Sequence, residues 1–232
     1  MEHKRLTLFA GHYGSGKTNI AVNYALHLAK EGKAVCIADL DIVNPYFRTA
    51  DSAKELANAG VALISPQFAN SNVDLPALPA EAYRLVEDKS IYGVMDIGGD
   101  DRGAYALGRY VPFMKEENNY RMAFVANCYR PLTRTPEEAL EVMREIEAAC
   151  GLQFTCIVNN SNLGTETTAQ TVMDSLEFIE NLSQLSGLPL WLHTARADVA
   201  AALTVPNVLP LQLQERYFDL PSQKPQNRPL WG

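Results

Sequence analysis

The sequence predicts an α/β protein in which helices flank both faces of a mostly parallel central sheet, giving three layers. Short apolar runs rich in β-branched residues alternate along the chain with longer amphipathic stretches, as they do in strand–helix–strand units. The apolar runs are continuous rather than alternating, which is typical of strands buried on both faces. A length of 232 residues fits one large domain of this class.

Apolar runs and amphipathic stretches define the expected elements in order. Strands are expected at residues 5–10, 33–39, 61–65, 91–97, 120–126, 153–159 and 188–193. Helices are expected between most of them, at residues 17–31, 50–59, 77–88, 102–114, 136–149 and 166–186. Residues 1–220 are then a single domain, and residues 221–232, rich in Pro, Gln and Asn, are a surface tail.

Composition excludes several classes of protein. With 20 Lys and Arg against 27 Asp and Glu, the formal net charge is −7, which argues against non-specific binding to nucleic acid or anionic lipid. No apolar run reaches the ~18 residues of a membrane span. The cysteines at 36, 128, 150 and 156 lack metal-site or redox spacing, so we interpret them as free thiols of a cytoplasmic protein.

The first predicted turn from strand to helix carries a phosphate-binding motif. Residues 11–18 match the pattern G-x-x-x-x-G-K-[ST]. Glycines let successive N–H groups turn toward an anion, and the start of the helix adds its positive dipole. Lys17 is expected to reach the β- and γ-phosphates, and the Thr18 hydroxyl to ligate Mg²⁺. The predicted phosphate cradle consists of Gly11, His12, Tyr13, Gly14, Ser15, Gly16, Lys17 and Thr18.

Acidic residues end two other predicted strands. Asp96 precedes Gly98 and Gly99, whose backbone can approach a γ-phosphate, and Asp39 and Asp41 close the strand at 33–39. In open α/β sheets, ligands gather at the carboxyl ends of strands, so these carboxylates are candidate metal and catalytic groups. The structural alternative for any one of them is an N-cap for the next helix.

The order of these motifs resembles the MinD and ParA group of P-loop ATPases, a set that includes CobQ/CobB-type domains. The resemblance covers about residues 5–210 and implies a P-loop NTPase fold that uses ATP and Mg²⁺. It further implies that Asp41 positions the attacking water, that Asp39 supports Mg²⁺ or Lys17, and that Asp96 holds a Mg²⁺-bound water.

One departure from that group concerns dimerisation. MinD and ParA proteins usually carry a second lysine after the first glycine of the loop, where it reaches the phosphates of the partner in a dimer; this chain has His12 there. A nucleotide-dependent homodimer is therefore expected to form only weakly, with His12 either a weak substitute or a turn residue.

Base choice is inferred from a motif that the chain lacks. Guanine-specific relatives use N-K-x-D, which is absent, whereas Asn159 and Asn160 end the strand at 153–159. In the resembling ATPases an asparagine at this place binds adenine, and Pro210 lies where the group borders the base. The structural alternative for either asparagine is an Asx-turn.

Two function classes remain. The favoured one is a slow ATPase that acts as a nucleotide-dependent switch on a protein partner. The alternative is a small-molecule kinase, ligase or amidase on the same fold, similar to dethiobiotin synthetase. Prolines near the C-terminus argue against the amphipathic helix by which MinD binds membrane. We interpret His3, His27 and His193 as isolated residues without metal-site spacing. Arg130 and Arg134 belong to a loop at the carboxyl end of another strand, which is either a place where basic residues meet phosphate or a partner or, by default, a solvated loop.

Overall fold

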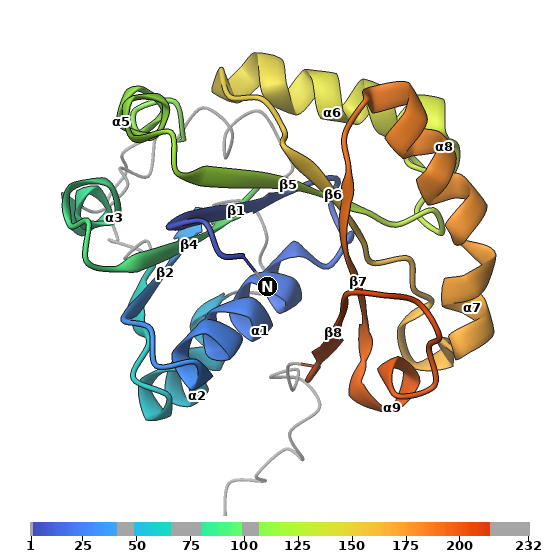
Figure 1. Cartoon of the computed structure of the whole chain (residues 1–232), viewed down its shortest axis with the longest axis horizontal. Helices are drawn as coiled ribbons and strands as arrows, with labels where there is room; N and C mark the ends of the chain where they lie inside the picture. Colours follow the sequence, from blue (N-terminus) through green and yellow to red (C-terminus); the bar gives the residue numbers. More distant parts are fainter. Residues whose placement is uncertain (1, 41–48, 66–79, 99–106, 214–232) are drawn as a thin grey trace, which may run out of the picture.

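The computed structural model describes residues 2–40, 49–65, 80–98 and 107–213. Within these residues the centre of the molecule is an eight-stranded sheet in the order β3-β2-β4-β1-β5-β6-β7-β8, and all neighbouring strands run parallel (Figure 1). The predicted fold class is confirmed. The strands are β1 (Leu6–Ala10), β2 (Val35–Leu40), β3 (Ala62–Ile64), β4 (Tyr92–Ile97), β5 (Tyr120–Ala126), β6 (Cys156–Asn159), β7 (Leu190–Arg196) and β8 (Val208–Leu211).

Helices cover both faces of the sheet (Figure 1). One face carries α1 (Lys17–Lys30) and α2 (Ala53–Asn58). The other face carries α3 (Arg84–Glu87), α5 (Val111–Glu117), α6 (Pro136–Cys150) and α8 (Leu176–Ser186). The remaining short elements are α7 (Ala169–Asp174), α9 (Ala197–Ala200) and the 3-10 turns η1 (Thr49–Ser52), η2 (Ala80–Tyr83) and η3 (Gly164–Glu166).

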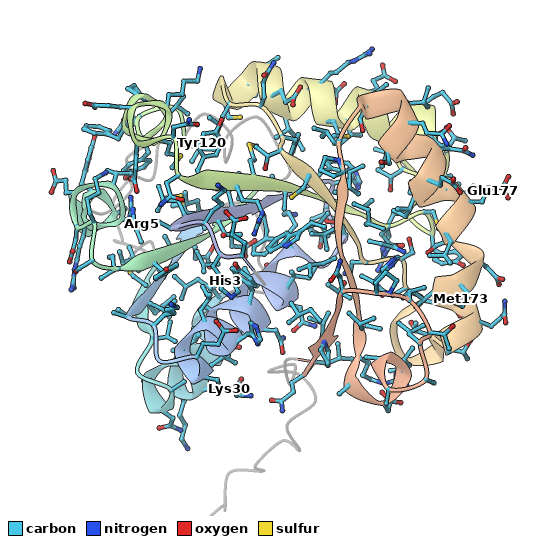
Figure 2. The ribbon with its side chains drawn as sticks, viewed as in Figure 1. His3, Arg5, Lys30, Tyr120, Met173 and Glu177 are labelled. Carbon is cyan, nitrogen blue, oxygen red and sulfur yellow. The ribbon has the colours of Figure 1, made fainter. Side chains whose placement is uncertain are left out.

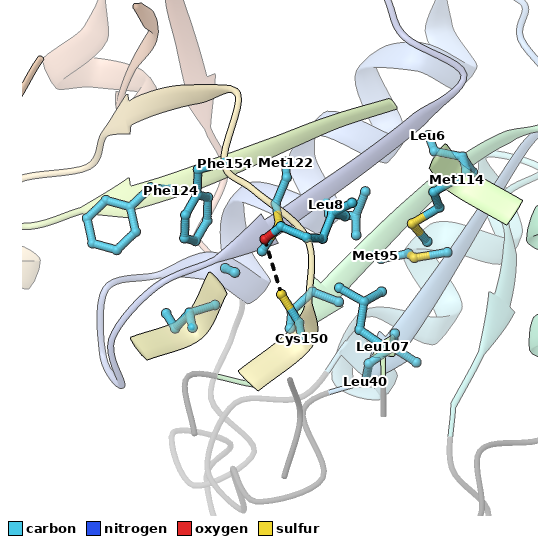
Figure 3. Packing of buried hydrophobic residues seen from close by; sticks show 14 of the residues in the cluster. Leu6, Leu8, Leu40, Met95, Leu107, Met114, Met122, Phe124, Cys150 and Phe154 are labelled. Carbon is cyan, nitrogen blue, oxygen red and sulfur yellow. Dashed lines mark hydrogen bonds between the residues drawn. The ribbon is translucent and has the colours of Figure 1, made fainter. Parts of the chain in front are cut away.

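Alternate residues of β1 supply both hydrophobic layers. Leu6, Leu8 and Ala10 belong to the cluster under α3, α5, α6 and α8, whereas Phe9 packs into the cluster under α1. Figure 3 shows part of the first cluster, in which Phe124 meets a second phenyl ring edge to face with centroids 5.3 Å apart. All five residues of β1 are buried, so the strand is continuous and apolar because both of its faces are covered.

A buried ion pair closes the amino edge of the sheet, where the central strands begin. The guanidinium of Arg5, just before β1, donates to both carboxylate oxygens of Glu117 at the end of α5. Its NH1 group also donates to the Leu85 and Ile91 carbonyls at 2.8 and 3.2 Å. Lys89 adds a second cation 2.6 Å from Glu117. The charges of Arg5 and Lys89 at this edge are therefore paired with the carboxylate of Glu117.

The structure differs from the sequence-based expectation near the C-terminal part of the sheet. It adds a strand, β8, which the pattern did not reveal because Pro210 interrupts it; Pro210 is exposed on an edge strand, where proline is tolerated. The single helix expected at 166–186 is two helices, α7 and α8, which meet at Ser175. Residues 214–232, which include the predicted tail, lie outside the described residues.

The cysteines are free thiols, as predicted. Cys36, Cys150 and Cys156 are buried, and burial raises the pKa of Cys36 to about 11 and that of Cys156 to about 12. Such thiols stay protonated near neutral pH and are poor nucleophiles. In the described part of the chain, no helix has both the length and the hydropathy needed to cross a membrane.

Candidate functional site

Residues 11–18, the glycine-rich loop, connect the end of β1 to the start of α1. Two of its glycines lie so close to other groups that a side chain there would clash. A Cβ on Gly11 would lie 2.6 Å from the Val125 carbonyl oxygen, and one on Gly16 would lie 2.2 Å from Nδ2 of Asn160. Gly16 also has φ of 94°, in the left-handed region. The loop therefore needs glycine at these positions on both steric and conformational grounds.

The amino end of α1 is open to a ligand. Gly16 is the N-cap and offers no capping side chain, and the first turn of the helix contains no acidic residue. The first helical bond runs from the Ile20 amide to the Gly16 carbonyl at 3.2 Å. Among the described residues, the amides of residues 17–19 have no backbone partner. These donors and the helix dipole favour an anion at this position.

Lys17 and Thr18 lie at the base of the loop and are both buried. Lys17 Nζ donates to the His12 carbonyl at 3.4 Å, a bond that spans the loop. The His12 ring lies 2.9 Å through Nδ1 from the Tyr13 carbonyl oxygen, and the Tyr13 side chain is exposed. The Lys17 ammonium group thus connects the two ends of the loop, and the side chains of His12 and Tyr13 lie on the outer side of the loop.

The two carboxylates expected beside the loop lie next to each other in the sheet. Asp39 of β2 is the register partner of Asp96 of β4, and Asp96 is also the partner of Phe9, two residues before Gly11. Asp39 and Asp96 are almost fully buried, and the Thr49 hydroxyl donates to Oδ2 of Asp96 at 3.4 Å. Gly98, which follows β4, is buried as well. The predicted residues Asp41 and Gly99 lie outside the described residues.

A cavity of about 240 Å³, here called the loop cavity, opens beside the glycine-rich loop. Asn160 holds its wall to the loop: its Nδ2 donates to the Ser15 carbonyl at 2.7 Å, and its Oδ1 accepts from the Thr194 hydroxyl at 2.7 Å. The lining residues come from the loop, from the ends of β5, β6 and β7, and from β8 and the residues after it. They are Gly14, Gly16, Lys17, Thr18, Asn19, Arg130, Asn160, Asn162, Gly164, Thr167, Ala195, Arg196, Leu211 and Leu213.

Two of the residues that we expected to contact the nucleotide base, Asn159 and Pro210, do not line the loop cavity. Asn159 is fully buried, and its Nδ2 donates to the Ser175 hydroxyl at 2.9 Å while its Oδ1 accepts from the Ser161 amide. Its amide therefore fixes the junction of α7 and α8, and of the two asparagines that we expected at a base only Asn160 lines the loop cavity. Pro210 is exposed on β8, and its neighbour Leu211 lines the cavity instead.

Arg130 lies beside the glycine-rich loop, as the alternative to a solvated loop predicted. It follows β5, lines the loop cavity, and its guanidinium is close enough to Gly14 that a Cβ there would lie 3.6 Å from Nε. Nε is buried and has no hydrogen-bond partner in the described residues. The signal in the sequence was its position after a strand, because the carboxyl ends of parallel strands meet at one edge.

The histidines at 3 and 27 are not isolated, contrary to the sequence-based interpretation. His3 Nε2 lies 2.9 Å and His27 Nε2 lies 3.2 Å from the two carboxylate oxygens of Glu31. Burial lowers the pKa of His3, which favours the neutral imidazole. His193 is buried, with Nδ1 3.3 Å from the Asn159 amide; it has the packing role that we expected.

Comparisons with known proteins agree with this geometry at the level of the fold. No protein-family model matches the chain, and no curated protein matches it. Among solved structures, the cell division protein FtsY of Thermotoga maritima superposes with a TM-score of 0.56 at 15% identity, over 82% of this chain and 61% of that one. Chloroplast FtsY of Physcomitrella patens gives 0.53 at 17% identity, over 83% and 59%.

A third structure contains a nucleotide. It is the signal recognition particle receptor FtsY of Elizabethkingia anophelis in complex with GDP, with a TM-score of 0.52 at 16% identity over 84% of this chain and 58% of that one. This chain spans about three fifths of the length of these proteins. Identities this low establish the fold alone, and the fold is that of the P-loop nucleoside triphosphatases.

Proposed function

We propose that this protein binds Mg-ATP at the glycine-rich loop, hydrolyses it slowly, and acts as a nucleotide-dependent switch on a protein partner. The observation that carries the proposal is the open amino end of α1. Its free amides and the Lys17 ammonium group face the loop cavity, and two buried carboxylates lie in register on neighbouring strands. This donor set matches a phosphate chain with its magnesium ion.

Each group has a distinct role in the proposed site. The loop amides and Lys17 would neutralise the β- and γ-phosphates. Oxygen donors are the ligands that Mg²⁺ prefers, so the Thr18 hydroxyl and the carboxylates of Asp39 and Asp96 would hold it, directly or through water. In hydrolysis a water oxygen bonds to the γ-phosphorus as the bond to the β–γ bridging oxygen breaks, releasing ADP and phosphate. Asp41 is the residue that we propose to orient that water.

The lining of the loop cavity favours adenine over guanine. A guanine-specific pocket needs a carboxylate that accepts the N1 and N2 protons, and none of the described residues that line the cavity is acidic. The carboxylate of Asp198, which is not among those lining residues, accepts from Arg196 at 2.5 and 2.7 Å. Asn160 and Asn162 line the cavity, and each amide already makes one donor and one acceptor bond within the protein. Adenine binding would use the second N–H and the remaining lone pair of such an amide.

The switch function rests on where the carboxylates lie along the chain. Asp39 and Asp96 are the penultimate residues of β2 and β4, at the carboxyl ends of the strands, where ligands gather in parallel sheets. We propose that the residues after each of them in the sequence are the ones that respond to the nucleotide. Contacts to a γ-phosphate are lost on hydrolysis, which changes the surface that those residues present to a partner. Because His12 lacks a permanent charge, we propose that nucleotide changes homodimerisation only modestly.

Calorimetry on the untagged full chain tests nucleotide binding. ATP should bind in the presence of Mg²⁺ at least about tenfold more tightly than GTP, the effect of one bidentate pair. Lys17→Ala should abolish binding, and Lys30→Ala, at the other end of α1, should leave it unchanged. Equal affinity for GTP would overturn the base assignment, and unchanged ATP binding by Lys17→Ala would overturn the site.

A turnover assay separates the switch from the small-molecule enzyme. Slow ATP hydrolysis without an acceptor, stimulated by a protein fraction, supports the switch. Turnover that requires a small carboxylate or hydroxyl compound, with phosphate transferred to it, would overturn the switch in favour of a kinase or ligase.

A further inference from the structure

We propose a second ligand site: a divalent transition-metal site formed by His3, His27 and Glu31 at the carboxyl end of α1. Nothing in the proposed ATPase function uses these residues. The site lies at the amino edge of the sheet, where His3 and Lys30 are labelled in Figure 2. His27 and Glu31 lie 10 and 14 residues after Lys17 of the glycine-rich loop, which is about 15 and 21 Å along the helix.

The ligand atoms are already gathered. One nitrogen of each histidine and a carboxylate oxygen of Glu31 lie within 4.8 Å of one another. A tetrahedral ion with bonds of about 2.1 Å places its ligand atoms roughly 3.4 Å apart. His3 Nε2 lies 2.9 Å from one carboxylate oxygen of Glu31, and His27 Nε2 lies 3.2 Å from the other; both distances are close to that separation. Small side-chain rotations would therefore let all three groups reach one ion.

Sequence and helix geometry fix two of the three ligands. His27 and Glu31 are four residues apart, so they lie on the same face of the last turn of α1. His3 comes from the segment before β1, and its side chain is only 7% exposed. The position also favours a cation because the carboxyl end of a helix carries partial negative charge.

Tyr24 supplies a hydrogen-bond partner for the second ring nitrogen of His3. Its hydroxyl lies 3.0 Å from Nδ1 of His3, and the side chain is fully buried against Phe9 and Trp191. A hydrogen bond at Nδ1 fixes the ring and leaves Nε2 2.9 Å from a carboxylate oxygen of Glu31, without a hydrogen-bond partner among the described residues. Metal-bound histidines usually have such a partner on their second nitrogen.

The donor set defines the class of metal. Two imidazoles and one carboxylate suit Zn²⁺, Ni²⁺, Co²⁺ or Cu²⁺, whereas Mg²⁺ and Ca²⁺ prefer all-oxygen ligands. Three protein ligands leave at least one position for water. The ion would join the segment before β1 to the end of α1, so its binding would stabilise the fold.

Zinc titration of the untagged full chain tests the site. We expect one Zn²⁺ per chain, and a rise in Tm of about 5 °C or more when zinc exceeds its Kd by about 100-fold. His27→Gln and Glu31→Gln should each weaken zinc binding by at least tenfold, and Tyr24→Phe by about tenfold through the outer shell. His27 is only partly buried, so its variant keeps the test independent of the buried His3.

Matched variants distinguish specific zinc binding by these three residues from non-specific binding elsewhere on the protein. Lys30→Gln changes a charge on the same helix turn, and His12→Gln removes a different imidazole; both should keep the wild-type zinc affinity. The visible absorption of Co²⁺ should report a site of low coordination number in the wild type and change in His27→Gln. Equal zinc affinity in the wild type and His27→Gln would overturn the proposal, as would binding no tighter than about millimolar. A loss of stability in His27→Gln that zinc leaves unchanged would show an ion pair only.

Discussion

The two ends of α1 differ in whether their polar groups already have partners within the protein. At its amino end, by the glycine-rich loop, the first turn has no acidic residue and the amides of residues 17–19 lack backbone partners in the described residues. At its carboxyl end, Glu31 contacts both His3 and His27. The amino end is incomplete without a ligand, whereas the carboxyl end is already paired. An anion therefore completes one end, and a metal at the other must displace the existing contacts between Glu31 and the two histidines.

The largest expected effect comes from a pair of glycines at these two ends. Gly16 and Gly32 both have positive φ, at 94° and 78°, but a Cβ would meet Asn160 only at Gly16. Gly16→Ala should lower ATP affinity by more than about 100-fold, because the loop must move away from Asn160. Gly32→Ala should cost about 1 kcal/mol of stability through backbone strain and leave affinity unchanged. Calorimetry and urea unfolding measure the two effects; similar affinities would remove the distinction between the ends.

A second prediction sharpens the assignment of roles at the amino end. Asp41→Asn should lower the hydrolysis rate by ~10² or more with an affinity change below about tenfold, because a water-orienting group acts mainly in the transition state. Asp96→Asn should weaken the Mg²⁺ dependence as well as the rate. Single-turnover hydrolysis at several Mg²⁺ concentrations separates the two variants. Normal hydrolysis by Asp41→Asn would show that another group holds the water.

A third prediction concerns the self-paired amino edge of the sheet. The hydrogen bonds from Arg5 hold the pKa of Glu117 below its ordinary value. A lowered folded-state pKa gives stability that is present above the unfolded carboxyl value of about 4.3 and is lost as pH falls through the folded value. Glu117→Gln should therefore cost about 2 kcal/mol at pH 7, with a gap to wild type that narrows in acid.

Urea unfolding at neutral and acid pH checks this prediction. Glu87→Gln, at an exposed glutamate of α3, is the control and should stay within about 0.5 kcal/mol of wild type. A gap between wild type and Glu117→Gln that stays constant with pH would mean that the pair contributes by packing rather than by charge.

The smallest effect is expected at Arg130. Its buried Nε has no protein partner in the described residues, so Arg130→Ala should leave stability unchanged while ATP affinity falls by about tenfold, the loss of one charge-assisted contact. Arg134→Ala, at an exposed arginine of the same loop, is the matched control. If both variants bind ATP equally well, Arg130 does not contact the nucleotide.

The sequence predicts those parts of the molecule that local chemistry determines. Continuous apolar runs locate β1, β4 and β5 to within a residue or two, because burial on both faces leaves that pattern. The glycine-rich loop is found by spacing, since its contacts allow only glycine at Gly11 and Gly16. Strand β8 is not predicted because a proline such as Pro210 is acceptable in a strand only at the edge of a sheet, and the sequence does not show which strand is at the edge.

The parts that were missed depend on contacts between distant segments. Asn159 and Asn160 are neighbours in sequence, and only the packing of Ser175 against one and of Ser15 against the other separates their roles. His3 and His27 meet because α1 runs back to the amino edge of the sheet. Composition and spacing carry no information on such encounters.

The order of strands also sets when the site can form during synthesis. β1 emerges first, yet its two neighbours in the sheet are β4 and β5, whose register with Leu6 begins at Gly93 and Tyr120. The wall of the loop cavity needs Asn160, and its rim needs Leu211. Pairings this remote in sequence close late, because loop-closure entropy opposes them until many contacts form together. The phosphate loop is therefore synthesised early, and nucleotide binding becomes possible only after the segment through Leu211 has left the ribosome.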